Sequence, residues 1–327
     1  MLVDREGLGD VMLKAPFLRA LRRTFPDHPV WWIATHTTSM ANELRPMFER
    51  DVAKVVTHSG LDGRIGPPLS RLRAFPPFER VFDMRTRGST VLFARFGLRH
   101  RGFYCCLPGY MFCDGRAPPG RKRPRHIAER ALSLVSCASG QTADASGQLE
   151  AATDALTFAG TSLPEGRTYV GIEPGSRQAN KNWPLDRYCQ VAVTLATKGL
   201  TPVFFLGPQE PEAEAQIAAA APDALIRRAD PNLSAADGLD RLIAQGQRLA
   251  LLLANDNGVG HLMGAAGVPV VSLFGPTDPA RWRPVTPVGG VLRAQDFGET
   301  SDMAAIPPEP VTEAVVTMLA RLGSPPS

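Results

Sequence analysis

Short apolar segments alternate along the chain with longer segments that carry apolar residues at helical spacing. Buried strands are predicted at residues 2–5, 30–35, 53–58, 80–84, 168–174, 201–207, 249–256 and 268–276. Helices are predicted at residues 11–26, 41–49, 69–75, 90–98, 126–136, 184–198, 212–222, 238–247, 260–267 and 309–323. Because this alternation is typical of parallel sheets with helices on both faces, the pattern predicts an α/β fold.

The chain divides into two such sets of strands and helices. Residues 138–166 are rich in Ala, Ser, Gly and Thr and show little periodicity, as expected at a domain boundary. The length of 327 residues also exceeds what one hydrophobic core usually organises. We therefore predict two Rossmann-like, doubly wound domains, at residues 1–150 and 151–327, facing a central cleft. Packing of the last helix back on the N-terminal domain is an option.

The composition is that of an ordinary globular protein with a slight basic excess. The formal net charge of +4 suits an anionic substrate or an anionic membrane surface and gives no reason to expect nucleic-acid binding. Five cysteines, an odd number without zinc-site spacing, indicate reduced thiols. The sequence shows neither a signal peptide nor an apolar run of about 20 residues, so we expect a cytoplasmic protein.

The first candidate segment is the turn Gly7-Leu8-Gly9-Asp10, between a strand and a helix. Its glycines, Gly7 and Gly9, let backbone amides approach a ligand, and the helix start offers unpaired N–H groups. The same residues also fit a plain turn in which Asp10 caps the helix, so both interpretations stay open. The G-x-G-x-x-G fingerprint of dinucleotide-binding proteins is absent.

The second segment follows the strand predicted at residues 168–174. Its loop contains Ser176, Arg177 and Lys181, and a helix begins at Pro184. Loop amides, a hydroxyl and two cations are the groups that bind a diphosphate. The alternative is a solvated basic loop in which Trp183 is a packing anchor.

The third segment, Asn255-Asp256-Asn257-Gly258-Val259-Gly260-His261, joins a buried strand to a helix. Its polar residues are expected at the carboxyl edge of the sheet, and the helix start again favours an anion. A structural role is also open, with Asp256 as a helix cap and His261 as a hydrogen-bonded helix residue.

Taken together, these segments resemble glycosyltransferase family 9, the ADP-heptose:lipopolysaccharide heptosyltransferases. The resemblance lies in GLGDVMLKAPFLRALRRTFP, PGSRQANKNWPLDRY and NDNGVGHLMGAAGVPVVSLFGPTDPARW. It implies a GT-B-like fold and an inverting transferase that needs no cofactor or metal. It also implies an N-terminal acceptor-binding domain and a C-terminal nucleotide-sugar-binding domain. The implied donor is ADP-heptose, and the implied acceptor is the lipid-linked inner core of lipopolysaccharide.

The family's site residues map onto this sequence. Asp10 matches the general base that takes the proton of the acceptor hydroxyl, and Gly7 and Gly9 form its glycine loop. The donor-binding positions match Ser176, Arg177, Lys181, Glu210, Asp256, Asn257, Gly258 and His261. Asn257 departs from the threonine usual in the family, which leaves the donor sugar open. The family's first strand is usually longer than residues 2–5, which leaves the completeness of the N-terminus open.

Two alternatives to heptosyl transfer remain. One is a GT-B glycosyltransferase with another donor or acceptor, and the other is a non-catalytic nucleotide-sugar binder, which would not need Asp10. Arginines crowd the N-terminal half, where they fit either an acidic acceptor or scattered solvated charge: Arg71, Arg73, Arg85, Arg87, Arg95, Arg99, Arg101, Arg121, Arg123 and Arg125. Peripheral contact with the cytoplasmic face of the inner membrane is a further option.

Overall fold

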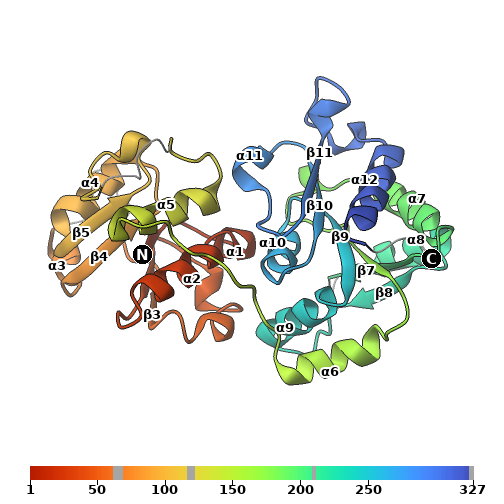
Figure 1. Cartoon of the computed structure of the whole chain (residues 1–327), viewed down its shortest axis with the longest axis horizontal. Coiled ribbons are helices and arrows are strands. Elements are labelled where there is room, and N and C mark those ends of the chain that lie inside the picture. The colour runs from red at the N-terminus through yellow and green to blue at the C-terminus, as the bar shows by residue number, and fades with distance from the viewer. Residues whose placement is uncertain (62–68, 116–121, 208–210, 324–327) are drawn as a thin grey trace. The chain divides into compact units, whose positions relative to one another are not determined.

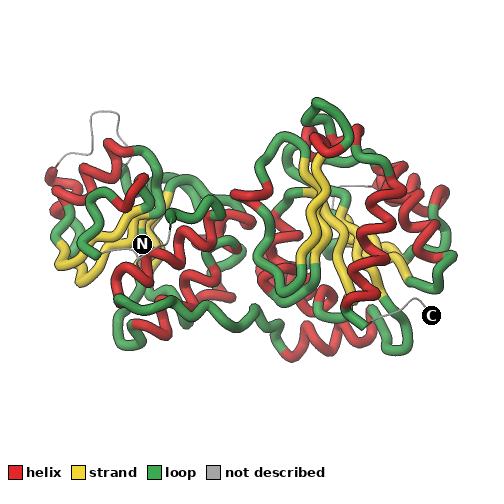
Figure 2. The backbone as a smooth tube through the Cα atoms, turned by 45° about the horizontal axis from the view of Figure 1, so that its top comes forward, coloured by secondary structure: helices red, strands yellow, loops and turns green. Residues whose placement is uncertain are grey.

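The computed structural model describes residues 1–61, 69–115, 122–207 and 211–323. The chain forms two compact units, Met1–Gly147 and Gln148–Ser327. Each unit is a parallel sheet that lies between helices (Figures 1 and 2).

The N-terminal unit contains a five-stranded sheet in the order β3-β2-β1-β4-β5. Its strands are β1 (Leu2–Val3), β2 (Trp31–Ala34), β3 (Lys54–Val56), β4 (Phe78–Asp83) and β5 (His100–Cys105). Its helices are α1 (Leu8–Met12), α2 (Ala15–Thr24), α3 (Leu69–Arg73), α4 (Gly88–Gly97) and α5 (Ile127–Ser139).

Alternating side chains of this sheet pack on opposite layers of helices. Val81 of β4 belongs to the core cluster that includes Val91 of α4. Its neighbour Phe82 points the other way, where its ring meets Phe17 of α2 edge-on at 5.4 Å between centroids. Because successive strand residues face opposite sides, an almost continuous apolar strand is what a sheet covered on both faces requires.

The C-terminal unit contains a six-stranded parallel sheet in the order β11-β10-β9-β6-β7-β8. Its strands are β6 (Tyr169–Glu173), β7 (Thr201–Leu206), β8 (Leu225–Arg228), β9 (Leu249–Asn255), β10 (Val270–Phe274) and β11 (Gly289–Arg293). Its helices are α6 (Thr153–Ser162), α7 (Leu185–Ala196), α8 (Pro211–Ala220), α9 (Ala235–Gly246), α10 (Gly258–Ala265), α11 (Pro279–Trp282) and α12 (Pro308–Arg321).

The strand orders of the two sheets follow one rule. In each unit the first strand is central, the next two continue to one side, and the fourth crosses to the other side. The order therefore reverses between β1 and β4 in one unit and between β6 and β9 in the other. Ligands of doubly wound folds bind outside the carboxyl ends of the strands at this reversal. The prediction of an α/β fold with two doubly wound parallel sheets is confirmed.

The helix predicted at residues 11–26 is wrong in one respect, because the structure has two helices there. α1 ends at Met12 and α2 begins at Ala15, with Pro16 in the first turn of α2. Proline has no N–H to donate to the carbonyl four residues earlier, so a continuous helix would lose a hydrogen bond at this position. The short helix predicted at residues 41–49 is likewise replaced by two 3₁₀ turns, Ser39–Ala41 and Pro46–Phe48.

Some elements were not predicted from the sequence. The strands β5, β8 and β11 lie at edges of their sheets, where half-exposed positions weaken the apolar pattern. α6 lies inside the Ala-rich region that was interpreted as a boundary, and it packs two alanines, Ala155 and Ala159, against Ala244 of α9. The closing helix α12 buries Val311, Val315 and Leu319 in the core of its own unit.

We expect Gly171→Ala to destabilise the C-terminal unit by about 1–3 kcal/mol, as overpacking of a core does. A Cβ added at Gly171 in β6 would lie 2.5 Å from Leu249 Cδ1 and 3.0 Å from Leu252 Cδ1. Gly160→Ala is the control, because a Cβ there meets nothing within 4 Å inside α6 and should stabilise the helix by up to about 1 kcal/mol. Urea unfolding of both variants measures the difference, and equal midpoints would contradict the packing argument.

Candidate functional site

The reversal of strand order in the C-terminal unit brings two predicted segments together. The segment after β6 begins at Pro174, and the segment after β9 begins at Asp256. β6 and β9 are paired neighbours, with Glu173 opposite Ala254. Both segments therefore leave the sheet at its carboxyl edge, where the third candidate segment was predicted to lie.

The buried amide of Asn255 ties these two segments to each other. Its Nδ2 donates to the carbonyl oxygen of Pro174 at 2.6 Å. Its Oδ1 accepts from the backbone N–H of Trp183 at 3.1 Å and from the hydroxyl of Tyr188 at 2.8 Å. Burial raises the pKa of Tyr188 well above its usual value, so the phenol keeps the proton that it donates. Asn255 thus fixes both ends of the loop between β6 and α7.

Asp256 collects three partners at the end of β9. Its Oδ2 lies 2.8 Å from Lys181 Nζ and accepts from Thr277 Oγ1 at 2.6 Å. Its Oδ1 lies 3.5 Å from Nε2 of His261. Burial acts to raise the pKa of Asp256, but the contacts with His261, Lys181 and Thr277 outweigh it and lower that pKa to about 2. The carboxylate is therefore ionised at neutral pH and holds the Lys181 ammonium at the edge of the sheet.

Asn257 caps the helix that follows. Its Oδ1 accepts from the backbone N–H of Gly260 at 2.8 Å, and its Nδ2 donates to the carbonyl oxygen of Gly175 at 2.6 Å. One side chain thus caps α10 and also holds the loop after β6. Gly258 is the first residue of α10, where backbone N–H groups of a helix lack carbonyl partners within the helix.

The remaining predicted donor residues are placed as follows. Ser176 Oγ accepts from the backbone N–H of Gln178 at 3.3 Å and so shapes the loop, and Arg177 is exposed on the same loop. His261 is buried in α10, and its Nδ1 has no hydrogen-bond partner among the residues that the structure describes. Glu210 lies outside the described residues. The structure thus gathers Lys181, Asp256, Asn257, Gly258 and His261, with Ser176 and Arg177 on the adjoining loop.

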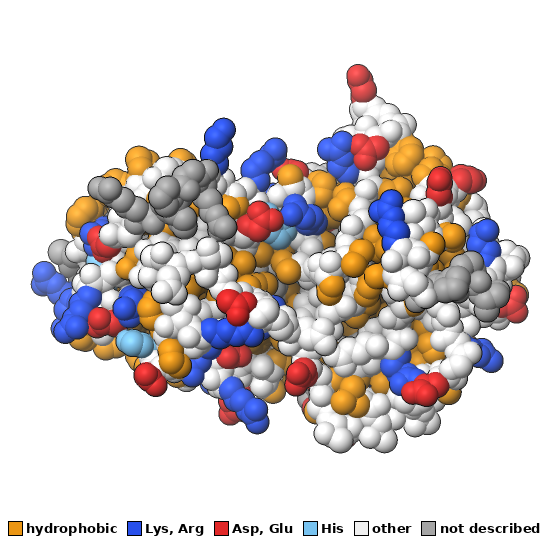
Figure 3. All heavy atoms as spheres, in the orientation of Figure 1, with side chains coloured by type: hydrophobic (Ala, Val, Ile, Leu, Met, Phe, Trp, Pro, Cys, Tyr) orange, Lys and Arg blue, Asp and Glu red, His pale blue; other side chains and the backbone are white. Residues whose placement is uncertain are grey.

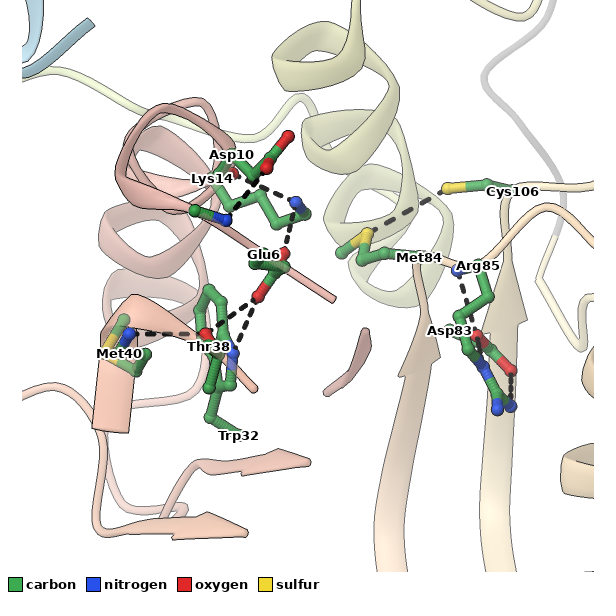
Figure 4. Close-up of polar contacts among 11 residues, drawn as sticks. Glu6, Asp10, Lys14, Trp32, Thr38, Met40, Asp83, Met84, Arg85 and Cys106 are labelled. Atoms are coloured by element: carbon green, nitrogen blue, oxygen red, sulfur yellow. Dashed lines mark hydrogen bonds and ion pairs between the residues drawn. The ribbon is translucent and has the colours of Figure 1, made fainter. Parts of the chain in front are cut away.

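In the N-terminal unit, Asp10 caps its own helix. Gly7 is the N-cap residue of α1, and its N–H donates to Asp10 Oδ2 at 3.0 Å (Figure 4). Gly9 is in the first turn of the same helix. The capping role considered from the sequence is therefore present. It uses one carboxylate oxygen of a half-buried side chain, so it does not conflict with a second role for Asp10.

Lys14 secures Asp10 from the other end of α1. Its own N–H donates to the carbonyl oxygen of Val11 at 2.9 Å, because the chain turns there into α2. In a continuous helix that N–H would donate to the carbonyl oxygen of Asp10. Here Lys14 Nζ donates to this oxygen instead, at 3.0 Å (Figure 4). The same ammonium lies 2.5 Å from Glu6 Oε1.

Glu6 in turn is anchored to the sheet. Its Oε2 accepts from Trp32 Nε1 at 3.0 Å and from Thr38 Oγ1 at 3.3 Å (Figure 4). Burial raises the pKa of Glu6, and Lys14 and the indole oppose this rise. Asp10 is therefore connected through Lys14 and Glu6 to residues of, and just beyond, β2.

The second ion pair drawn in Figure 4 corrects the interpretation of one arginine. Arg85 was counted among the basic residues of the N-terminal half, but it is buried. Its Nε and one terminal nitrogen hold both carboxylate oxygens of Asp83, at 2.8 and 2.6 Å. The other terminal nitrogen donates to the carbonyl oxygen of Leu61 at 2.8 Å. Arg85 therefore connects internal segments and does not face an acceptor.

Four residues that organise the two clusters were not among the site residues predicted from the sequence, namely Glu6, Lys14, Asn255 and Thr277. Asn255 was part of the third candidate segment but was given no role of its own. The signal for Asn255 was an amide at the end of the apolar run LALLLA. Thr277 follows the next strand of the same sheet, and so shares its edge. Glu6 and Lys14 gave no signal, since their pairing depends on the break between α1 and α2.

Comparison with known proteins identifies the family of the chain. The model of glycosyltransferase family 9 (heptosyltransferase) matches residues 108–306. Lipopolysaccharide heptosyltransferase 3 of Escherichia coli K12 is 31% identical over 122 residues, which cover 36% of this chain and 34% of that protein. The matched part is thus about a third of the relative's length.

Two solved structures share the fold over nearly the whole chain. A glycosyl transferase family 9 protein from Veillonella parvula has a TM-score of 0.69 at 20% identity, covering 98% of this chain and 97% of its own. The E. coli ADP-heptose lps heptosyltransferase II has a TM-score of 0.63 at 20% identity, covering 99% and 100%. The GT-B-like fold class predicted from the sequence is confirmed by these structures. Since the family model matches more than half of the residues, the chain belongs to glycosyltransferase family 9.

Proposed function

We propose that the protein is an inverting, metal-independent heptosyltransferase that moves heptose from ADP-heptose to the inner core of lipopolysaccharide. The observation that carries the proposal is the cluster of Lys181, Asp256 and Thr277 next to the start of α10, at the switch point of the C-terminal sheet. The names of the E. coli relatives, one a lipopolysaccharide enzyme and the other an ADP-heptose enzyme, supply the acceptor and the donor.

The reaction needs positive charge where the diphosphate leaves. The bond between the anomeric carbon and the diphosphate oxygen breaks through an oxocarbenium-like state, and its electron pair stays on ADP. The Lys181 ammonium, the exposed Arg177 guanidinium and the N–H groups at the start of α10 are donors of this chain that can stabilise that charge. A bound diphosphate would compete with Asp256 for Lys181, so the ion pair keeps the ammonium positioned until the donor arrives.

The acceptor side of the reaction needs a base. In the proposal, the acceptor oxygen forms a bond to the anomeric carbon from the face opposite the leaving group, and Asp10 takes the hydroxyl proton. The Gly7 N–H holds one oxygen of the Asp10 carboxylate, and Lys14, paired with Glu6, holds the backbone carbonyl of the same residue. Both contacts support this role, because a base works only when its carboxylate is held in one orientation. Lys14 and Glu6 would then be positioning residues.

A different donor sugar is the second candidate. The observation that favours it is Asn257, whose amide bonds both Gly260 and Gly175 at the position where the family usually has threonine. A non-catalytic nucleotide-sugar binder is the third possibility, and it would tolerate loss of Asp10.

The proposed acceptor is lipid-linked, so the proposal includes peripheral contact with the cytoplasmic face of the inner membrane. No helix among the described residues is long and apolar enough to cross a bilayer.

Calorimetric titration without metal tests the donor. ADP-heptose should bind more tightly than UDP- or GDP-sugars, and Lys181→Ala should weaken that binding by about 10–100-fold, as loss of a charge-assisted hydrogen bond does. Lys198→Ala, which removes an exposed lysine of the same unit, is the matched control. Tighter binding of a UDP- or GDP-sugar would mean that the donor is not ADP-heptose. Equal binding by Lys181→Ala and wild type would contradict the assignment of Lys181 to the donor site.

Turnover of Asp10 and Lys14 variants tests the acceptor side. Asp10→Asn should lower kcat by about 10²–10⁴-fold while donor affinity stays within about twofold. Lys14→Met leaves the Glu6 carboxylate buried without its cation and should lower kcat by about tenfold or more. Lys14→Arg should restore part of the loss, and Lys54→Met, on the exposed β3, is the control. Full activity of Asp10→Asn would refute its role as base.

Acid unfolding tests the charge state of Asp256. A pKa of about 2 in the folded state, below the ordinary 3.8, means that the ionised carboxylate contributes about 2 kcal/mol above pH 4. This contribution is lost as the pH falls through the range from 3.8 to 2. The free energy of unfolding of Asp256→Asn should therefore approach that of wild type as the pH is lowered from 5 to about 3. Exposed Asp223→Asn is the control, and a pH-independent gap for Asp256→Asn would contradict the assignment.

A further inference from the structure

The outer face of α4 is apolar, which is unusual for a short surface helix. Phe96 is 77% exposed and Phe93 is 36% exposed. The two are three residues apart and so lie on the same side of the helix, next to half-buried Leu92. The opposite side of α4 already fills the core with Val91 and Ala94. Phe96 therefore contributes little to the packing of this unit and Phe93 is only partly used in it, and contiguous apolar patches of this kind mark interaction sites.

The elements that neighbour the end of α4 carry exposed arginines. α3 packs directly on α4, since a Cβ added at Gly97 would lie 2.2 Å from Leu72 Cδ1. Arg99 donates to the carbonyl oxygen of Phe75 at 2.8 Å, which joins the start of β5 to the end of α3. The carboxyl ends of α3 and α4 and the start of β5 thus form one surface. We define this aromatic-basic face by its exposed members, Arg73, Phe93, Phe96, Arg99 and Arg101. Arg71 is not a member of the face, because its guanidinium lies against Gly60 in the segment after β3.

The charge on this face is strongly one-sided. Of its three arginines, Arg101 lies 3.4 Å from Glu79, and the Arg101 side chain is still 82% exposed. Figure 3 shows Lys and Arg side chains gathered over α3 and β5, with apolar side chains over α4. Two copies of such a face would repel each other, so self-association through it is disfavoured.

We propose that the aromatic-basic face docks the protein on the surface of an anionic phospholipid bilayer. Phenylalanine side chains on a helix that lies along the surface insert at the boundary between head groups and acyl chains, and arginines beside them pair with lipid phosphates. A basic and aromatic composition matches such a surface better than it matches an uncharged partner. The inference rests on the proposed function only for its purpose, which is to bring the N-terminal unit to a lipid-linked acceptor.

Co-sedimentation of the full chain with vesicles tests the docking. Wild type should bind vesicles of phosphatidylcholine with about one third phosphatidylglycerol, bind pure phosphatidylcholine weakly, and be released at about 0.5 M salt. Phe93→Ser with Phe96→Ser should weaken partition about tenfold or more. Arg73→Gln with Arg101→Gln should also weaken partition, by about fivefold for each charge removed. The control is Leu156→Ser with Phe158→Ser, which removes exposed apolar side chains from α6 of the other unit.

The outcomes separate this inference from the proposed function. Vesicle binding requires no nucleotide sugar, so a chain that binds vesicles but not ADP-heptose would refute the proposed function alone. Unchanged binding by the α4 variant, with circular dichroism confirming its fold, would overturn the docking surface. If light scattering shows a dimer of the wild type and a monomer of the Phe93→Ser, Phe96→Ser variant, the docking surface would also be overturned. The face would then be an interface with a second copy of the chain. If the face docks the protein on the bilayer, the Phe93→Ser, Phe96→Ser variant keeps its turnover on a detergent-solubilised acceptor and loses turnover on an acceptor in vesicles.

Discussion

The candidate donor site depends on one buried neutral group, the amide of Asn255. An unpaired amide in a dry interior costs more than a hydrogen bond returns, so it is tolerated only when all its strong partners are present. Here Pro174, Trp183 and Tyr188 satisfy it. The same bonds fix the path of the loop that carries Lys181. The loop that would bind a diphosphate is therefore shaped by the carboxyl edge of the sheet itself.

Three ion pairs differ in how much of their cation is exposed to solvent, and this exposure decides whether a ligand can reach the cation. Asp83 and Arg85 are fully buried, and their bidentate contact leaves no atom of the arginine for a ligand. Glu6 and Lys14 are nearly buried, and their ammonium is used by the backbone of Asp10. The Lys181 side chain keeps 17% of its surface exposed while Asp256 lies beneath it at 6%. Of these three cations, Lys181 is the one that an incoming anion can reach.

Most elements of the fold could be predicted because each unit is a repetition of buried strand and amphipathic helix. The predictions failed where the apolar pattern of a segment does not by itself determine its secondary structure. Pro16 divides a segment whose apolar spacing is helical throughout. The edge strands β8 and β11 lack continuous burial, and β5 begins with the polar residues His100 and Arg101. The candidate donor residues Lys181 and Asp256 could be named because they follow strands. Their contact across 75 positions of sequence could not, since it requires β6 and β9 to be neighbours.

The sequence by itself determined the fold class, the two sets of strands and helices, and the residues that carry charge and glycine at the ends of those strands. Tertiary structure alone decided which of these residues meet. Strand order places Asp256 beside Lys181 and Thr277, and the break before Pro16 turns Lys14 back onto Asp10 and Glu6. Burial then decided that Arg85 is internal while Phe96 is exposed. The reason is that periodicity records which face of an element is apolar, whereas partners and solvent exposure depend on how the elements pack.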